Sequence, residues 1–145
     1  MTTDAWLAIA HHLGVFGLLA VLAAEWGLVR PGLDAAGAGR VARIDAAYGG
    51  FAALVLVAGV ARLVWGEQPF DFYDDQPAFW VKMASFATVG ALSVPPTLRF
   101  LRWRDLDGPP PDDDVRGAQR GIRLQLLVFP LIPVAAALMA RHIGA

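Results

Sequence analysis

The chain has 145 residues, which is enough for a single domain. Its residues are 57% hydrophobic and 17% charged, whereas a soluble domain carries about 25% charged residues. The net charge is −1 and there is no cysteine, so the composition excludes disulfides, thiolate metal sites and thiol catalysis and gives no indication of nucleic-acid binding. It predicts an integral membrane protein whose main partner is the lipid bilayer.

Four apolar segments predict four transmembrane helices, at about residues 5–29, 46–65, 79–98 and 124–141. A helix of about 20 residues crosses a bilayer core of about 30 Å. Segment 51–60 reads FAALVLVAGV and lacks the polar stripe of a soluble helix. Residues 1–145 are therefore expected to form one all-α, up-down-up-down four-helix bundle.

Small residues are spaced to let the first two helices approach closely. Gly14 and Gly17 fall on one face of the first segment, and Gly49 and Gly50 fall in the second. Lipid tails are as apolar as the helix surfaces, so the hydrophobic effect does not bring helices together inside a membrane. Close packing of small residues is a common way to stabilise the contact between two such helices.

Prolines interrupt the third and fourth segments. Pro95 and Pro96 lie in the third, so that helix must continue to about Trp103 or the membrane must be thin there. Pro130 and Pro133 lie in the fourth and predict a kink, because each removes a backbone donor. The stretch GPPPDDD predicts a mobile polar loop at about residues 105–115.

The connections differ in charge, which predicts the orientation. The arginines of the first and third connections are Arg30, Arg40, Arg43, Arg99, Arg102, Arg104, Arg116, Arg120 and Arg123. The middle connection carries Glu67, Asp71, Asp74 and Asp75. Arginine-rich connections stay in the cytoplasm, so both termini are expected on the non-cytoplasmic side. The N-terminus has no basic n-region, so we expect the first segment to be a retained helix of a multi-pass protein in a bacterial inner (plasma) membrane.

The three histidines fall near the predicted non-cytoplasmic face. His11 and His12 lie in the first segment, and His142 ends the fourth, three residues after Met139. Imidazole is a common ligand for haem iron and for copper. The sequence therefore allows haem b between His11 and His142, with His12 as an alternative ligand, or a copper site of His11, Met139 and His142. The structural alternative is an interfacial histidine bonded to a neighbouring carbonyl.

Two cations share this layer. Arg62 ends the second segment, and Lys82, the only lysine, begins the third. Such side chains could bind the propionates of haem or another anionic ligand through charge-assisted bonds. Alternatively, both extend to the membrane surface and pair with the acidic connection.

Glu25 is the acidic residue nearest the other end of the first segment, with Arg43, Arg99 and Arg123 as candidate structural partners. The sequence contains no nucleophile–histidine–acid arrangement, phosphate-binding loop or acidic metal cluster. It therefore identifies no catalytic residue and leaves open whether the protein is an enzyme. Any catalysis would depend on a cofactor.

Several short motifs carry a family resemblance over nearly the whole chain. They are AHHLGVFGLL, AEWGLVR, RIDAAYGG, FWVKMASF and SVPPTLRFLRW. Together they resemble an uncharacterised bacterial family of small four-helix membrane proteins, known only as a domain of unknown function. This resemblance implies the architecture and no particular activity.

A second resemblance is to the haem-containing protoporphyrinogen oxidase HemJ and the copper-resistance protein CopD. It is carried by His11 or His12 in the first helix and by Lys82 in a W-x-K context in the third. HemJ-type sequences have a histidine two residues before this lysine, where this chain has Trp80. His142 would have to supply the missing ligand.

Three functional interpretations follow. The first is a haem-b-binding or redox-associated bundle with His11 and His142 as axial ligands and Arg62 and Lys82 beside the propionates. The second is a non-enzymatic accessory or scaffold protein that forms a homo-oligomer or joins a larger membrane complex. The third is copper handling or small-molecule transport.

Overall fold

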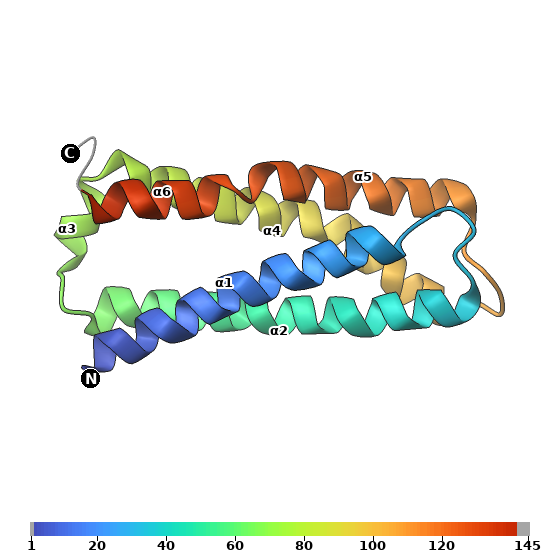
Figure 1. Ribbon diagram of the computed structural model, residues 1–145, viewed down its shortest axis with the longest axis horizontal. Helices are drawn as coiled ribbons and strands as arrows, with labels where there is room; N and C mark the ends of the chain where they lie inside the picture. Colours follow the sequence, from blue (N-terminus) through green and yellow to red (C-terminus); the bar gives the residue numbers. More distant parts are fainter. Residues whose placement is uncertain (1, 142–145) are drawn as a thin grey trace.

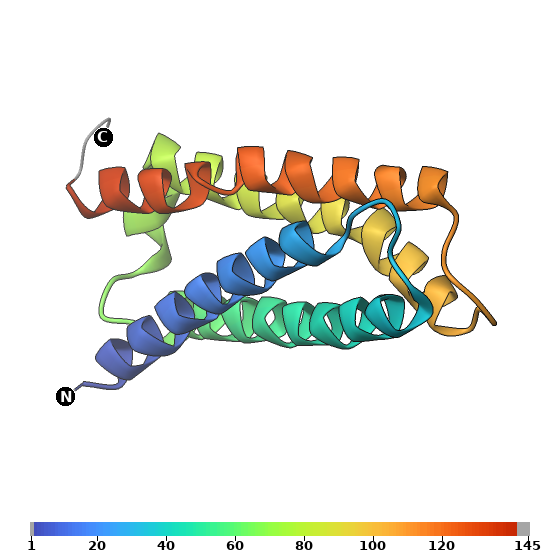
Figure 2. The same ribbon diagram turned by 45° about the vertical axis from the view of Figure 1, so that its right-hand side comes forward.

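The computed structural model describes residues 2–141, which are helical throughout apart from short connections. The helices are α1 (Thr3–Leu28), α2 (Ala35–Trp65), α3 (Phe70–Asp74), α4 (Pro77–Arg104), α5 (Asp112–Val128) and α6 (Leu131–Ala140). Helices α1, α2 and α4 run antiparallel in sequence order, and α5 and α6 follow one another along α4 as the fourth span (Figures 1 and 2). The predicted all-α four-helix bundle is confirmed.

The two ends of the bundle differ in composition. One end, here called the α3 end, contains the start of α1, the short α3 and the end of α6 (Figure 1, left). The other, here called the arginine-rich end, contains the α1–α2 and α4–α5 connections (Figure 1, right). Which side of a membrane each end faces stays a prediction.

The outer surface of the bundle is apolar, as lipid contact requires. Phe16, Val57 and Leu127 expose 66%, 68% and 66% of their surface. Four helical segments are long and apolar enough to cross a bilayer: α1, α2, α4 and the combined α5–α6. A water-soluble bundle would bury such side chains, so the fold is that of a membrane protein.

Three helices extend further than their apolar segments indicate. Helix α2 begins at Ala35, where the Asp34 carboxylate accepts a hydrogen bond of 2.6 Å from the Gly37 N–H. Helix α4 continues to Arg104, and α5 begins at Asp112, so the loop expected at 105–115 is confined to residues 105–111. Hydropathy marks only the apolar part of a helix, whereas these polar turns are stabilised by caps and by acidic residues at the helix N-terminus.

Glycines bring α1 and α2 into close contact. A Cβ atom on Gly14 would lie 2.7 Å from the Val55 side chain, and one on Gly17 would lie 2.6 Å from the Phe51 ring. These distances are shorter than van der Waals contact, so a larger residue would force the Val55 or Phe51 side chain, or the helices themselves, to shift. The predicted role of the small residues is confirmed for α1. It is wrong for Gly49 and Gly50 of α2, which are exposed and where a Cβ would meet nothing within 4 Å.

The proline pair does not end α4. Pro96 has no N–H to donate to the Leu92 carbonyl one turn earlier. The Gln125 side-chain amide of α5 lies 3.5 Å from that carbonyl and provides a substitute donor. Gly121 permits this approach, because a Cβ there would lie 2.5 Å from the Pro96 ring. The break in α4 is thus compensated by a neighbouring helix.

The predicted kink in the fourth span is confirmed. Helix α5 ends at Val128 and α6 begins at Leu131, so the interruption lies at Phe129 and Pro130. Pro133 falls in the first turn of α6, where the backbone N–H groups have few intrahelical acceptors and a missing donor costs little.

The contact between Gly121 and Pro96 predicts a specific loss of stability. Gly121→Ala should lower the free energy of unfolding by about 1–3 kcal/mol, because the added methyl overpacks the interface. The matched control is Gly90→Ala in α4, where a Cβ would meet nothing within 4 Å. The free energy of unfolding of both variants is measured in mixed detergent micelles. Equal stability of the two variants would contradict this packing.

Candidate functional site

Three basic side chains line two cavities at the α3 end of the bundle. His11, Arg62 and Lys82 border both a cavity of about 100 Å³ and a neighbouring one of about 490 Å³. We call the two together the α3-end pocket. Its walls are otherwise mainly apolar: Val15, Phe16, Leu19, Val55, Leu56, Val60, Leu63, Phe79, Met83, Phe86, Phe129 and Ile132. No Asp or Glu is among its lining residues.

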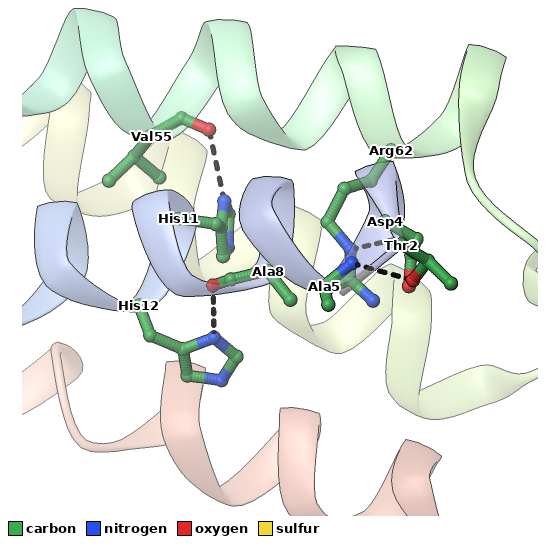
Figure 3. A network of polar contacts seen from close by, with 8 residues as sticks. All are labelled: Thr2, Asp4, Ala5, Ala8, His11, His12, Val55 and Arg62. Carbon is green, nitrogen blue, oxygen red and sulfur yellow. Dashed lines mark hydrogen bonds and ion pairs between the residues drawn. The ribbon is translucent and has the colours of Figure 1, made fainter.

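His11 is held across the α1–α2 interface. Its Nδ1 lies 3.1 Å from the Val55 carbonyl oxygen of α2 (Figure 3). A carbonyl only accepts, so Nδ1 donates and Nε2 carries the lone pair. Gly59 makes room for the ring, since a Cβ there would come within 3.4 Å of it. Nε2 has no hydrogen-bond partner among residues 2–141 and remains free for a ligand.

His12 is bound more locally. Its Nδ1 lies 2.7 Å from the Ala8 carbonyl in the preceding turn of α1 (Figure 3). Its ring meets that of His11 edge-on, with the centroids 6.1 Å apart, and it lines the larger cavity only. Both histidines therefore make the carbonyl contact of the structural alternative, but only His11 is fixed between two helices.

Arg62 pairs within the bundle instead of with the acidic connection. Its Nε lies 3.2 Å from the Asp4 carboxylate at the start of α1 (Figure 3). Asp4 belongs to the first turn of α1, which Thr2 caps by accepting the Ala5 N–H. The pair fastens the end of α2 to the beginning of α1 and partly neutralises the Arg62 charge.

Lys82 has no acidic partner in the described part of the chain. Its Nζ lies 5.7 Å from the centroid of the Phe79 ring, one turn earlier in α4, within the range of a weak cation–π contact. The side chain is half-buried and faces the same cavities as Arg62 and His11. The pocket thus holds one paired and one unpaired cation.

The remaining predicted ligands do not complete a metal site. His142 lies outside the described residues, so its position relative to His11 is not tested. Met139 is buried on α6 and is not among the residues that line either cavity. Residues 2–141 contain no group of three or more His, Asp or Glu side chains placed to hold a metal ion. The two-histidine haem site and the copper site stay predictions.

A second polar site lies inside the bundle, closer to the arginine-rich end. The Tyr48 hydroxyl donates to the Gln125 side-chain oxygen at 2.9 Å. The Thr97 hydroxyl donates to the Asp45 carboxylate at 3.0 Å, and the Glu25 carboxyl group lies beside that of Asp45, close enough for one of them, when protonated, to donate to the other. Helices α1, α2, α4 and α5 each contribute to these five residues, which we call the four-span cluster.

Glu25 is therefore not paired as the sequence suggested. Arg99 bonds to Asp114 at 2.9 Å, and neither Arg43 nor Arg123 forms an ion pair among residues 2–141. The partner of Glu25 is a second acid, Asp45.

Four members of the four-span cluster were not predicted as site residues: Asp45, Tyr48, Thr97 and Gln125. Asp45 and Tyr48 are three residues apart and share one face of α2, and Gln125 is an isolated amide in the apolar stretch LQLLVF. The short spacing of Asp45 and Tyr48 and the isolation of Gln125 in an apolar stretch are the sequence features that could have identified these residues.

Fold and site together define a multi-pass α-helical membrane protein with polar groups gathered inside its bundle. The chain belongs to the family described as "Predicted membrane protein (DUF2214)", whose family model matches residues 3–144. The predicted membership of a domain-of-unknown-function family is thereby confirmed. No curated protein and no solved structure matches the chain significantly.

The hydrogen bond between Tyr48 and Gln125 predicts coupled stability effects. Gln125→Leu should lower the free energy of unfolding by about 1–3 kcal/mol, because the Tyr48 hydroxyl and the Leu92 carbonyl lose their partner. Tyr48→Phe should cost about 1 kcal/mol, and the double variant less than the sum. Thr88→Val is the control, since that hydroxyl bonds only within its own helix, to Ala84. Strict additivity would contradict the contact.

Proposed function

We propose that the α3-end pocket binds an apolar molecule that carries an acidic group. The observation that carries this proposal is Lys82, a half-buried cation in a membrane span with no carboxylate partner in residues 2–141. A charge in the bilayer is costly and usually acquires a counter-ion. A carboxylate or phosphate group on a bound ligand would provide one.

The walls of the pocket support the same ligand class. Arg62 shares its charge with Asp4 and retains further N–H donors, so it can hold a second oxygen of the acidic group. Around these cations the lining is aliphatic and aromatic, from Val15 on α1 to Phe86 on α4 and Ile132 on α6. A ligand with one acidic end and an apolar body matches both parts of this lining.

The charge of the connections supports one orientation. Because arginine-rich loops are usually retained in the cytoplasm, the α3 end and its pocket would lie in the non-cytoplasmic half of the membrane. For a bacterial inner membrane, the ligand would then come from the outer leaflet or from the periplasmic side.

Binding of a fluorescent fatty acid tests this proposal. Dansyl-undecanoic acid should bind the purified protein in detergent, and its neutral methyl ester should bind more weakly, because only the acid offers a counter-charge. Lys82→Met should weaken binding of the acid about tenfold, the loss expected for one charge-assisted hydrogen bond.

The matched control is Arg120→Met, which removes one positive charge from an exposed position on α5, outside the pocket. It should bind the acid like the unchanged protein. Equal affinity for acid and ester, or an unaltered affinity in Lys82→Met, would contradict the proposal.

Haem b is a second candidate ligand, favoured by the geometry of His11. Donation from Nδ1 to a backbone carbonyl is the usual second contact of a haem- or metal-binding histidine, and it directs the Nε2 lone pair away from the Val55 carbonyl. Arg62 and Lys82 would hold the two propionates. Haem, when bound, supplies electron-transfer chemistry; His11 orients it and the apolar walls exclude water.

Absorption spectra test the haem candidate. Protein purified in mild detergent and incubated with haemin should show a Soret band that shifts on reduction and is lost in His11→Ala. His12→Ala is the neighbouring control and should retain the band. Loss in His142→Ala as well would identify a second axial ligand. No Soret band, or one that survives in His11→Ala, would refute ligation by His11.

A further inference from the structure

The carboxyl group of Glu25 lies in an unusual environment. The residue is 2% exposed, at a position where α1 packs against α2. Its Oε1 atom accepts no hydrogen bond from any donor of residues 2–141. Its carboxyl group instead lies beside that of Asp45, which is 8% exposed. Two acids thus meet in the interior of a membrane protein.

A hydrogen bond between two carboxyl groups requires a proton. An ionised carboxylate only accepts, so two ionised groups repel each other, whereas one protonated group donates to the other. A nearby cation could stabilise two negative charges, but no Lys or Arg of the described residues forms an ion pair with Glu25 or Asp45. Two adjacent buried carboxyl groups without a basic partner among residues 2–141 therefore indicate a pair that holds one proton.

The neighbouring donors indicate which group is protonated. The Thr97 hydroxyl of α4 donates to the Asp45 carboxylate at 3.0 Å and stabilises its negative charge. Glu25 receives no comparable bond. With the proton on Glu25, its hydroxyl donates to Asp45, and Asp45 then accepts hydrogen bonds from two helices.

The other helices around the pair contribute no positive charge. A third titratable group, Tyr48 on α2, interacts with both acids, and its hydroxyl is engaged as a donor to Gln125. Helix α4 contributes Thr97 and α5 contributes the neutral Gln125. The cluster therefore contains neutral donors and two acids, a set that suits a proton better than a bound anion.

We propose that Glu25 and Asp45 form a proton-binding site in which Glu25 carries one exchangeable proton and Asp45 carries the negative charge. The ligand is the proton itself, and the site is separate from the α3-end pocket. Binding places the proton in the hydrogen bond between α1 and α2; release leaves two adjacent buried negative charges. The loss of the proton should therefore loosen the packing of α1 against α2.

Infrared spectroscopy of the full chain in detergent tests this proposal. At neutral pH the unchanged protein should show the C=O band of a protonated carboxylic acid, with the small downshift in D₂O that marks an exchangeable proton. The band should disappear at alkaline pH. In Glu25→Gln this C=O band should be absent at every pH above the range in which ordinary carboxyl groups titrate.

Stability measurements provide a second, independent readout. The melting temperature of the unchanged protein should fall as the pH rises from neutral to alkaline, because deprotonation creates the charge pair. Glu25→Gln, whose amide keeps a donor toward Asp45 and cannot ionise, should lose this dependence. Glu67→Gln is the matched control, since Glu67 is exposed near the end of α2 and its substitution should preserve both the band and the pH dependence.

Three results would overturn the proposal. The first is the absence of a protonated carboxyl band from the unchanged protein at neutral pH, a result that does not depend on how any variant folds. The second is a band that persists in Glu25→Gln. The third is a stabilisation by sodium ions at alkaline pH that Asp45→Asn abolishes, which would identify the ligand as a metal cation.

Discussion

The constraint on which this structure depends is that hydrocarbon satisfies no polar group. Every polar side chain within the spans must find a partner inside the bundle or bend back to its own helix. Ser85 and Thr88 take the second course and bond to carbonyls one turn earlier. Other polar side chains find partners inside the bundle, namely Glu25, Asp45 and Gln125. Their contacts bring four helices together around one cluster. The few polar residues of the spans therefore fix which helix faces contact each other.

The same constraint separates two polar regions of the bundle. At the α3 end, Lys82 lacks a carboxylate partner among the described residues and the pocket has apolar walls, so a complementary ligand would have to supply negative charge. Toward the arginine-rich end, Glu25 and Asp45 form no ion pair with a basic side chain of residues 2–141, and a positive species would relieve the repulsion between them. A proposed anion site and a proposed proton site thus occupy opposite halves of one small bundle.

Much of the fold could be predicted because its signals are local. Uncharged stretches marked the spans, and Gly14 and Gly17 marked a close helix contact. The layer containing His11, Arg62 and Lys82 was also predicted, because Arg62 and Lys82 bracket the acidic connection and the first helix begins at the same end of an up-down bundle. The partner of Glu25 could not be predicted, because pairing depends on how each helix is rotated about its axis. The donor that α5 supplies to the Leu92 carbonyl of α4 could not be predicted either. Both features depend on contacts between helices that are far apart in the sequence.

The interruption at Phe129 and Pro130 divides the fourth span into two helices, α5 and α6, with different neighbours. The longer helix, α5, carries Gln125 and is anchored through it to α2 and α4. The shorter helix, α6, borders the larger cavity with small side chains at Ala136, Ala137 and Ala140. A tilt of α6, which has ten residues, about this break would change the size of the ligand that the larger cavity can hold. The anchored half need not follow, so the wall formed by α6 is the adjustable one.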